Sequence, residues 1–382
     1  MSHWRQGLGG RMTPITLRRR ELLLGAAGMA GIAVSTGALA QSADDGAMTY
    51  RGVTYDTGTD FGYPGYLSRM SWHESDVREE IAAIRGRLNC NAIQIVGTDH
   101  ARLRLAAEIA QENGLKIWLQ PRIMEKPADA QLAHMVEAAT HARDLAANGA
   151  DVVFNVGCEA TIFQQGIVPG ATYAERIPRI FSAQPDEAAR VRTELNAYLV
   201  RSAEAARKHF SGPLTYGAAS WEVVDWSPFD IAGVNLYRDD SNRAGYRETL
   251  RGHMQHGVPL VITEFGACTF EGAGRYGGGG FMIVDYSVEP PRIPEGFVRS
   301  EAEQAREIAE LLAIFSAEGV AGAFVYNFLS QFDFHADDPR RDLDMASHAI
   351  VKVREAAEDA PVEWEPKQAF HEIARIYDDL QP

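Results

Sequence analysis

The stretch Pro259-Leu-Val-Ile-Thr-Glu-Phe-Gly266 decides how the rest of the chain is interpreted. Leu260 to Thr263 are apolar or β-branched, which is the composition of a short buried strand. Glu264 ends this run, and a buried carboxylate is costly unless it is paired or used chemically. The carboxyl ends of parallel strands often carry catalytic groups. Glu264 is therefore a candidate catalytic residue; the alternative is a glutamate that caps a turn or pairs with an arginine.

The same pattern, a short apolar run followed by a stretch with helical periodicity, recurs along the chain from residue 50. The predicted strands are 51–56, 91–97, 115–121, 151–157, 213–219, 230–236, 259–266 and 320–326. The predicted helices are 74–88, 101–113, 129–148, 186–209, 243–256, 301–318 and a last one that begins after Pro366.

This alternation of strands and helices, with no linker inside it, predicts the α/β class and a single (β/α)8 TIM barrel over residues 50–382. The alternative is a doubly wound open sheet. Such a sheet usually carries a glycine fingerprint in its first strand-to-helix turn, and Thr57-Gly58-Thr59 does not provide one.

The first 40 residues have the pattern of an export signal rather than of a folded element. Arg18-Arg19-Arg20-Glu-Leu-Leu precedes an apolar, alanine- and glycine-rich run that ends in Ala38-Leu-Ala40. Paired arginines followed by x-Leu-Leu are typical of a twin-arginine signal. We expect cleavage near Gln41, an acidic linker over 41–49 and a periplasmic or secreted protein; an uncleaved membrane anchor is the alternative.

Charge and composition exclude several kinds of partner. Without residues 1–40 the chain keeps 32 basic (37 − 5) and 51 acidic (52 − 1) side chains, a formal charge of −19. This argues against nucleic acid or an anionic membrane as partner, since both need a basic face. The three cysteines form no even-numbered framework, and neither H-E-x-x-H nor C-x-x-C occurs. We therefore expect no metal and no other cofactor; the sequence does not indicate an oligomeric state.

A second carboxylate lies at the matching place on another predicted strand. Glu159 follows the fourth strand, whereas Glu264 ends the seventh, so both are expected on the same rim of the barrel. Two carboxylates that face each other across a pocket are the equipment of glycoside hydrolysis, one donating a proton and the other attacking the sugar. The alternative for Glu159 alone is an acidic residue that starts a helix.

Here the sequence resembles the retaining glycoside hydrolases of the barrel clan called clan A. Val-Ile-Thr-Glu264-Phe-Gly is similar to their nucleophile strand, and Asn155-Val-Gly-Cys-Glu159 resembles their acid/base strand, with Cys158 in place of the usual asparagine. Asn235-Leu-Tyr237 resembles the sixth-strand segment whose tyrosine donates a hydrogen bond to the nucleophile. The resemblance implies Glu159 as acid/base, Glu264 as nucleophile and Tyr237 as its hydrogen-bond donor.

Further residues near the strand ends are expected to bind the sugar. Gln94 stands where the resemblance would often have an arginine, and Tyr326 begins a segment where it often has a tryptophan. Tryptophans at strand ends are candidates for stacking on sugar rings. The predicted substrate-binding residues are Asp56, Gln94, Trp118, Asn155, Trp221, Asn235, Arg275 and Tyr326.

The function expected from the sequence is an exported retaining glycoside hydrolase that cleaves an oligosaccharide or polysaccharide by double displacement. A non-catalytic carbohydrate-binding barrel and a transglycosylase with the same two glutamates remain alternatives. The long segment from Ala267 to Phe297, with glycines at 277–280, favours a substrate-binding loop over a flexible linker.

Overall fold

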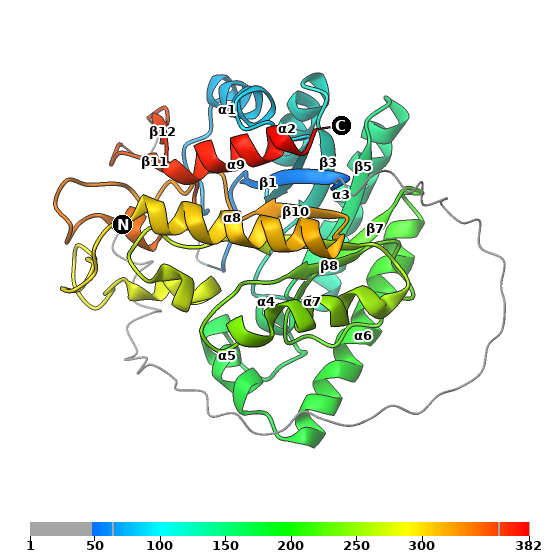
Figure 1. Ribbon diagram of the computed structural model, residues 1–382. Helices are drawn as coiled ribbons and strands as arrows, with labels where there is room; N and C mark the ends of the chain where they lie inside the picture. Colours follow the sequence, from blue (N-terminus) through cyan, green and yellow to red (C-terminus); the bar gives the residue numbers. More distant parts are fainter. Residues whose placement is uncertain (1–47, 63–64, 358–359, 382) are drawn as a thin grey trace.

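Eight parallel strands close into a barrel in the computed structural model, which describes residues 48–62, 65–357 and 360–381 (Figure 1). Around the barrel the strands follow the order β1-β10-β9-β8-β7-β5-β3-β2. The predicted (β/α)8 barrel is confirmed, and all eight predicted strands are present. Their bounds are β1 Tyr50–Asp56, β2 Ala92–Gly97, β3 Lys116–Pro121, β5 Val152–Cys158, β7 Leu214–Ala219, β8 Ala232–Asn235, β9 Leu260–Phe265 and β10 Gly322–Val325.

Helices cover the outside of the barrel, and in Figure 1 the yellow α8 and the red α9 run side by side in front of β10 and β1. The connection from β7 to β8 carries no helix, so the alternation of strand and helix is interrupted once there. The covering helices are α1 Glu74–Gly86, α2 His100–Glu112, α3 Ala128–Ala147, α6 Pro185–Arg207, α7 Tyr246–His253, α8 Glu301–Glu318 and α9 Gln368–Asp379. Among the described helices, none is long and apolar enough to cross a membrane.

Local sequence explains where these helices begin and end. The side chain of Asp99 accepts hydrogen bonds from the first backbone N–H groups of α2, and Ser300 does the same for α8. Gly319 ends α8 in the left-handed conformation, which glycine adopts without steric cost. These signals define the start of α2 and both ends of α8.

The inside of the barrel changes character along its axis. Near the amino ends of the strands, Trp118 packs against the rings of Tyr50 and Phe324, with centroids 5.1 and 4.9 Å away, and fills the core. Further toward the carboxyl ends, Gln94 donates to the side chain of Thr54 and to the carbonyl of Thr263. The interior thus becomes polar toward the rim where the predicted glutamates lie.

Several segments are added to the simple barrel. Between β5 and α6 the chain forms α4 (Ala160–Phe163) and α5 (Tyr173–Ser182). After β9 it forms the short helical turns η4 (Ala273–Arg275) and η5 (Gly277–Ile283). Small two-stranded sheets and further short helical turns complete the described chain: β4 Lys126–Pro127, β6 Gln164–Gln165, β11 Val351–Val353, β12 Trp364–Pro366, η2 Arg243–Gly245, η3 Met254–His256 and η6 Leu343–Ala346.

Candidate active site

Glu159 and Glu264 lie at the carboxyl ends of β5 and β9, as the sequence predicts. Glu264 is the second-to-last residue of β9 and is 7% exposed. Glu159 follows β5 directly, and its backbone adopts the left-handed conformation with φ 42° and ψ 52°. This conformation costs a non-glycine residue roughly 1–2 kcal/mol, so surrounding contacts must maintain it. The backbone N–H of Glu159 donates to the carbonyl of Gly217 at 2.9 Å and supplies one such contact.

Asn235 and Cys158 connect the two carboxylates. The side-chain amide of Asn235 donates to Oε1 of Glu159 at 2.9 Å and lies 3.5 Å from the thiol sulfur of Cys158. That sulfur lies 3.8 Å from Oε1 of Glu264. Thr263 donates to the amide oxygen of Asn235 at 2.7 Å, which fixes the orientation of the amide so that its N–H points at Glu159. The two glutamates therefore belong to one hydrogen-bonded group.

Arg122 supplies the positive charge of the site, and sequence reasoning missed it. It follows β3 directly, is 7% exposed, and forms an ion pair with Oε1 of Glu264. Its Nε donates to Gln120 at 2.5 Å, which fixes the guanidinium. Gln94 on β2 carries no charge at the position where the resemblance would often have an arginine. The structure shows that Arg122, after the adjacent strand β3, supplies the positive charge instead.

Tyr237 contacts the other oxygen of the same carboxylate. Its hydroxyl donates to Oε2 of Glu264 over 3.5 Å, at the long limit of a hydrogen bond. Oε1 is thus occupied by a charged donor, whereas Oε2 has only this weak contact. An oxygen with a free lone pair is the one available to attack an electrophile, so the arrangement favours Oε2 as the reactive atom.

The environment of Glu159 favours its protonated form. Burial, and then the negative charge of Glu264, raises the pKa of Glu159 to about 8. Repulsion by a neighbouring carboxylate is the cause expected for any such pair. The structure adds burial as the larger one. Glu159 is therefore protonated at neutral pH, while Glu264 lies against the guanidinium of Arg122.

Glu222, a third buried carboxylate that sequence reasoning also missed, supports the turn after Glu159. It accepts hydrogen bonds from the backbone N–H and the hydroxyl of Thr161, at 3.0 and 2.7 Å. It also accepts from the hydroxyl of Tyr216 and from the backbone N–H of Ala219, at 2.9 and 3.0 Å. Tyr216 in turn accepts from the N–H of Ala160 at 2.6 Å. These bonds hold the left-handed turn at Glu159 in place. In the sequence, the one signal for Glu222 is that it follows β7.

Of two other predicted substrate-binding residues, Tyr326 lies close to Glu264, whereas Asn155 is buried in the barrel. Burial, and then the charge of Glu264, raises the pKa of Tyr326, a residue whose backbone N–H donates to the carbonyl of Phe265 at 2.8 Å. Asn155 is fully buried below the rim, and its amide oxygen accepts from the N–H of Gly157 at 3.2 Å. The amide nitrogen of Asn155 has no hydrogen-bond partner.

Asp56 and Arg275 are engaged in local structure. Asp56 accepts from the N–H of Gly58 at 2.9 Å and from the hydroxyl of Thr59 at 3.2 Å, so it shapes the loop after β1. Arg275 lies on η4 and forms an exposed ion pair with Asp240 at 2.9 Å. An exposed pair of this kind is screened by water and contributes little to stability.

The remaining predicted residues are distributed between the core and the rim. Trp118 is fully buried in the aromatic layer at the amino ends of the strands, and the structure does not bring it to the glutamates. Gln94 bonds within the barrel interior, below the rim. Trp221, by contrast, lies on the rim after β7 and is 36% exposed.

The glycines at 277–280 allow close packing rather than free movement. A Cβ on Gly278 would lie 3.1 Å from the ring of Tyr237, and one on Gly280 would lie 2.7 Å from the sulfur of Cys268. The segment therefore packs against the back of Tyr237, which contacts Glu264. The segment is therefore packed against the site and is not a free linker.

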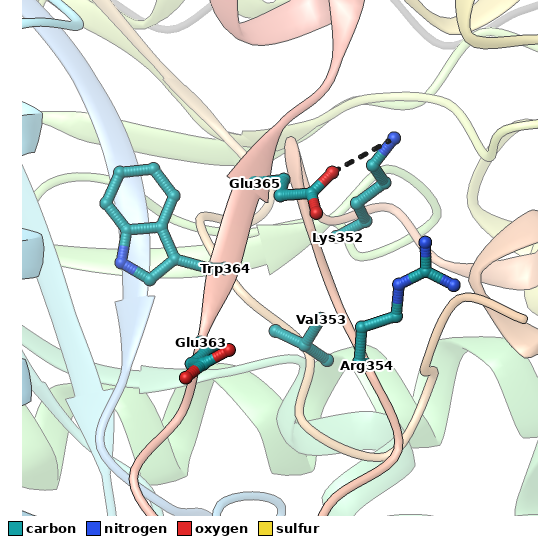
Figure 2. A pocket seen from close by; sticks show the side chains of 6 residues that line it. All are labelled: Lys352, Val353, Arg354, Glu363, Trp364 and Glu365. Carbon is teal, nitrogen blue, oxygen red and sulfur yellow. Dashed lines mark ion pairs between the residues drawn. The ribbon is translucent and has the colours of Figure 1, made fainter.

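A separate pocket lies away from the two glutamates. Figure 2 shows its six lining side chains, which come from β11, β12 and the residues next to them; Lys352 pairs with Glu365 at 3.6 Å. In the residues that the structure describes, no group of three or more His, Cys, Asp or Glu has the geometry to hold a metal. In the segment that begins at His335, the possible ligands are used in ion pairs instead: His335 pairs with Asp342, and Asp337 pairs with Arg354.

Comparison with known proteins gives matches among solved structures. No family model matches the chain, and no curated protein sequence matches it. The β-mannanase AaManA of family GH113 from Alicyclobacillus acidocaldarius superposes with a TM-score of 0.53 at 16% identity, over 87% of this chain and 98% of that one. A second solved GH113 β-1,4-mannanase gives a TM-score of 0.54 at 13% identity, over 87% of this chain and 99% of that one.

A β-glucosidase from Pyrococcus furiosus superposes with a TM-score of 0.51 at 10% identity, over 89% of this chain and 96% of that one. The similar structures are thus (β/α)8-barrel glycoside hydrolases of clan A, as the sequence resemblance indicates. At this identity the likeness concerns the fold, and the chemistry must be argued from the residues of the site.

Proposed function

We propose that this protein is a retaining glycoside hydrolase, with Glu264 as nucleophile and Glu159 as acid/base. The observation that carries the proposal is the pairing of a carboxylate held by Arg122 with a buried carboxyl group whose pKa is raised to about 8. A carboxyl group with a raised pKa can act as the acid beside a second carboxylate that acts as nucleophile. The likeness of the fold to glycoside hydrolases supports a carbohydrate substrate.

In the first step, the protonated Glu159 gives its proton to the oxygen of the glycosidic bond. Oε2 of Glu264 attacks the anomeric carbon, the bond to the leaving sugar breaks, and a glycosyl ester forms. Formation of the ester removes the charge of Glu264, one of the two causes that raise the pKa of Glu159. The pKa of Glu159 therefore falls. In the second step Glu159 accepts a proton from the water that attacks the anomeric carbon, and the bond between that carbon and Oε2 breaks, which releases the sugar and restores the carboxylate of Glu264.

Export through a twin-arginine-like signal over residues 1–40 is part of the proposal and rests on the sequence. These residues lie outside the described part of the structure. The oligosaccharide or polysaccharide substrate would then be met in the periplasm or outside the cell. The strongly acidic mature chain supports a partner other than nucleic acid.

The test begins with a screen of the purified protein against aryl glycosides and bacterial and plant polysaccharides. On the substrate found, Glu264→Gly should abolish hydrolysis, and added azide should give a product of inverted anomeric configuration. Glu159→Ala should still cleave substrates with good leaving groups, and azide should give a product of retained configuration. The opposite stereochemistry would exchange the two roles.

Two other outcomes would change the function. Full activity of both variants would overturn the assignment of the pair. Binding of sugar without turnover would favour a non-catalytic carbohydrate-binding barrel. Transfer to a second sugar in preference to water would favour a transglycosylase, which uses the same two glutamates.

A further inference from the structure

We propose that Trp221 and Phe181 form a binding subsite for the leaving portion of an oligosaccharide, so that the substrate is a sugar chain rather than a small glycoside. The inference rests on the proposed function and extends it to the class of substrate. It is based on two exposed aromatic rings that the fold holds beside the turn of Glu159.

The two rings form an apolar surface that is exposed to solvent rather than packed in the core. Phe181 is 47% exposed and Trp221 is 36% exposed, and their rings meet edge to face with centroids 5.3 Å apart. The next apolar side chain along the chain, Val223, is 60% exposed. Large apolar side chains gathered on a surface mark binding sites more often than chance.

Trp221 is held rigidly at its polar edge. Its indole N–H donates to the hydroxyl of Thr161 at 3.2 Å, and that hydroxyl donates to Glu222. Glu222 also accepts from Ala219, two residues before Trp221, so both the backbone and the ring edge are fixed. Because the N–H points inward, the surface left to solvent is the apolar ring.

Phe181 lies on α5, a helix that the buried side chain of Arg176 holds in place. Arg176 is the buried residue of α5, where it pairs with Glu125 at 2.5 Å. It also donates to the carbonyls of Ile162 and Gly170, at 2.5 and 2.9 Å. Burying a guanidinium is costly unless it is fully paired. This anchor fixes α5 to the loops after β3 and β5, with Phe181 at its exposed end.

The position of this surface assigns it to the leaving sugar. Thr161 follows Glu159 by two residues, within the turn whose N–H groups bond to the carbonyl of Glu159. Glu159 protonates the oxygen that the leaving sugar carries away, so an aromatic ring bonded to the turn of Glu159 lies on the side where that sugar would bind. The C–H faces of pyranose rings are apolar and weakly positive, which complements the negative face of an aromatic ring.

The experiment compares substrates that have a leaving sugar with substrates that lack one. The probes are β-1,4-linked manno- and cello-oligosaccharides, together with β-mannobiosyl and β-cellobiosyl fluoride. Fluoride occupies no sugar-binding position when it leaves. Trp221→Ala should lower kcat/KM for the oligosaccharides roughly ten- to a hundredfold, as loss of a central tryptophan contact does. The same variant should hydrolyse the fluorides within about twofold of wild type.

Control variants separate this role from a structural one. Trp221→Phe, which keeps an aromatic ring, should retain most of the oligosaccharide activity, and Phe181→Ala should show the same selective loss as Trp221→Ala. Val200→Ala removes an exposed apolar side chain from α6 and should change neither rate. Equal losses with fluorides and oligosaccharides, or no loss with either, would overturn the subsite while leaving the proposed function intact.

A wild type that cleaves neither probe would count against the proposed function, and binding would then decide the subsite. Calorimetric titration with the same oligosaccharides should show binding to wild type that Trp221→Ala weakens at least about tenfold. Equal binding by both proteins, or none by wild type, would overturn the subsite.

Discussion

The guanidinium of Arg122 and the carboxylate of Glu264 form a buried ion pair that joins the end of β3 to the end of β9. Both groups are removed from water, and an unpaired charge there would be costly, so each is the other's compensating partner. The pair also fixes which oxygen of Glu264 is occupied. The proposed nucleophile, Glu264 on β9, is thus oriented by Arg122, a residue that follows a different strand.

Replacing Arg122 tests this dependence. Arg122→Met should lower kcat/KM about 10²–10³-fold, the size of effect seen when a buried active-site donor is removed, because Glu264 then loses its only cationic partner in the described site. Arg122→Lys should recover part of the activity, because it keeps the charge but loses the fork that also contacts Gln120. Kinetics with an aryl glycoside and thermal unfolding should be measured together.

Arg251→Met provides the matched control, since Arg251 forms an exposed pair with Glu318 at 2.6 Å on the outside of the barrel. It should leave kcat/KM unchanged. An Arg122→Met protein that folds normally and keeps wild-type kinetics would show that Glu264 does not need this partner.

The pH dependence of the reaction should report Glu159. The acid is active in its protonated form, and burial together with the charge of Glu264 raises its pKa to about 8. Activity should therefore be present below this value, and kcat/KM should fall as the pH rises through about 8. A basic limb near the ordinary pKa of a glutamate would contradict the assignment of Glu159 as acid.

Asn235 provides a directional test of the same group. Its amide N–H stabilises the charged form of Glu159 and so lowers the pKa of that carboxyl group. Asn235→Ala should therefore raise the pKa of Glu159 and move the basic limb of the kcat/KM profile to higher pH. A shift to lower pH would mean that another residue titrates in this limb.

The order of the strands and the place of the two glutamates could be predicted because each strand leaves a local pattern. A short apolar run that ends in a carboxylate is visible at Glu264 without any knowledge of its neighbours. The barrel then brings Glu159 to the same rim. Chain order alone sufficed for these features.

Arg122 and Trp118 show where such reasoning fails. Arg122 becomes special only because the closed barrel brings the end of β3 within reach of β9, a contact across 142 residues. Trp118 packs in the aromatic layer near the amino ends of the strands, whereas Gln94, its register partner on β2, bonds nearer the catalytic rim. Position along one strand does not fix depth in the barrel, because the strands tilt against the barrel axis and the layer depends on how the barrel closes.

Export can be tested independently of the enzyme chemistry. Mature protein should begin near Gln41, and replacing Arg19 and Arg20 together by Lys should block its appearance outside the cytoplasm. Amino-terminal sequencing and cell fractionation are the measurements. Unchanged export of the double-lysine variant would exclude the twin-arginine route.

The glycines beside Tyr237 give the last prediction. A Cβ on Gly278 would lie 3.1 Å from the Tyr237 ring, so the ring must shift by a few tenths of an ångström. The hydroxyl of Tyr237 is already 3.5 Å from Oε2 of Glu264, so a displaced ring changes this contact. Gly278→Ala should therefore lower kcat roughly two- to tenfold, within the effect of one weak hydrogen bond.

Gly279→Ala is the matched control, because its Cβ would meet only the terminal methyl group of Met282, an exposed and flexible side chain. It should leave kcat unchanged. If Gly278 acts through Tyr237, adding Gly278→Ala to Tyr237→Phe should cause no further loss, since the hydroxyl is already absent. Additive losses in the double variant would show that Gly278 affects the site by another route.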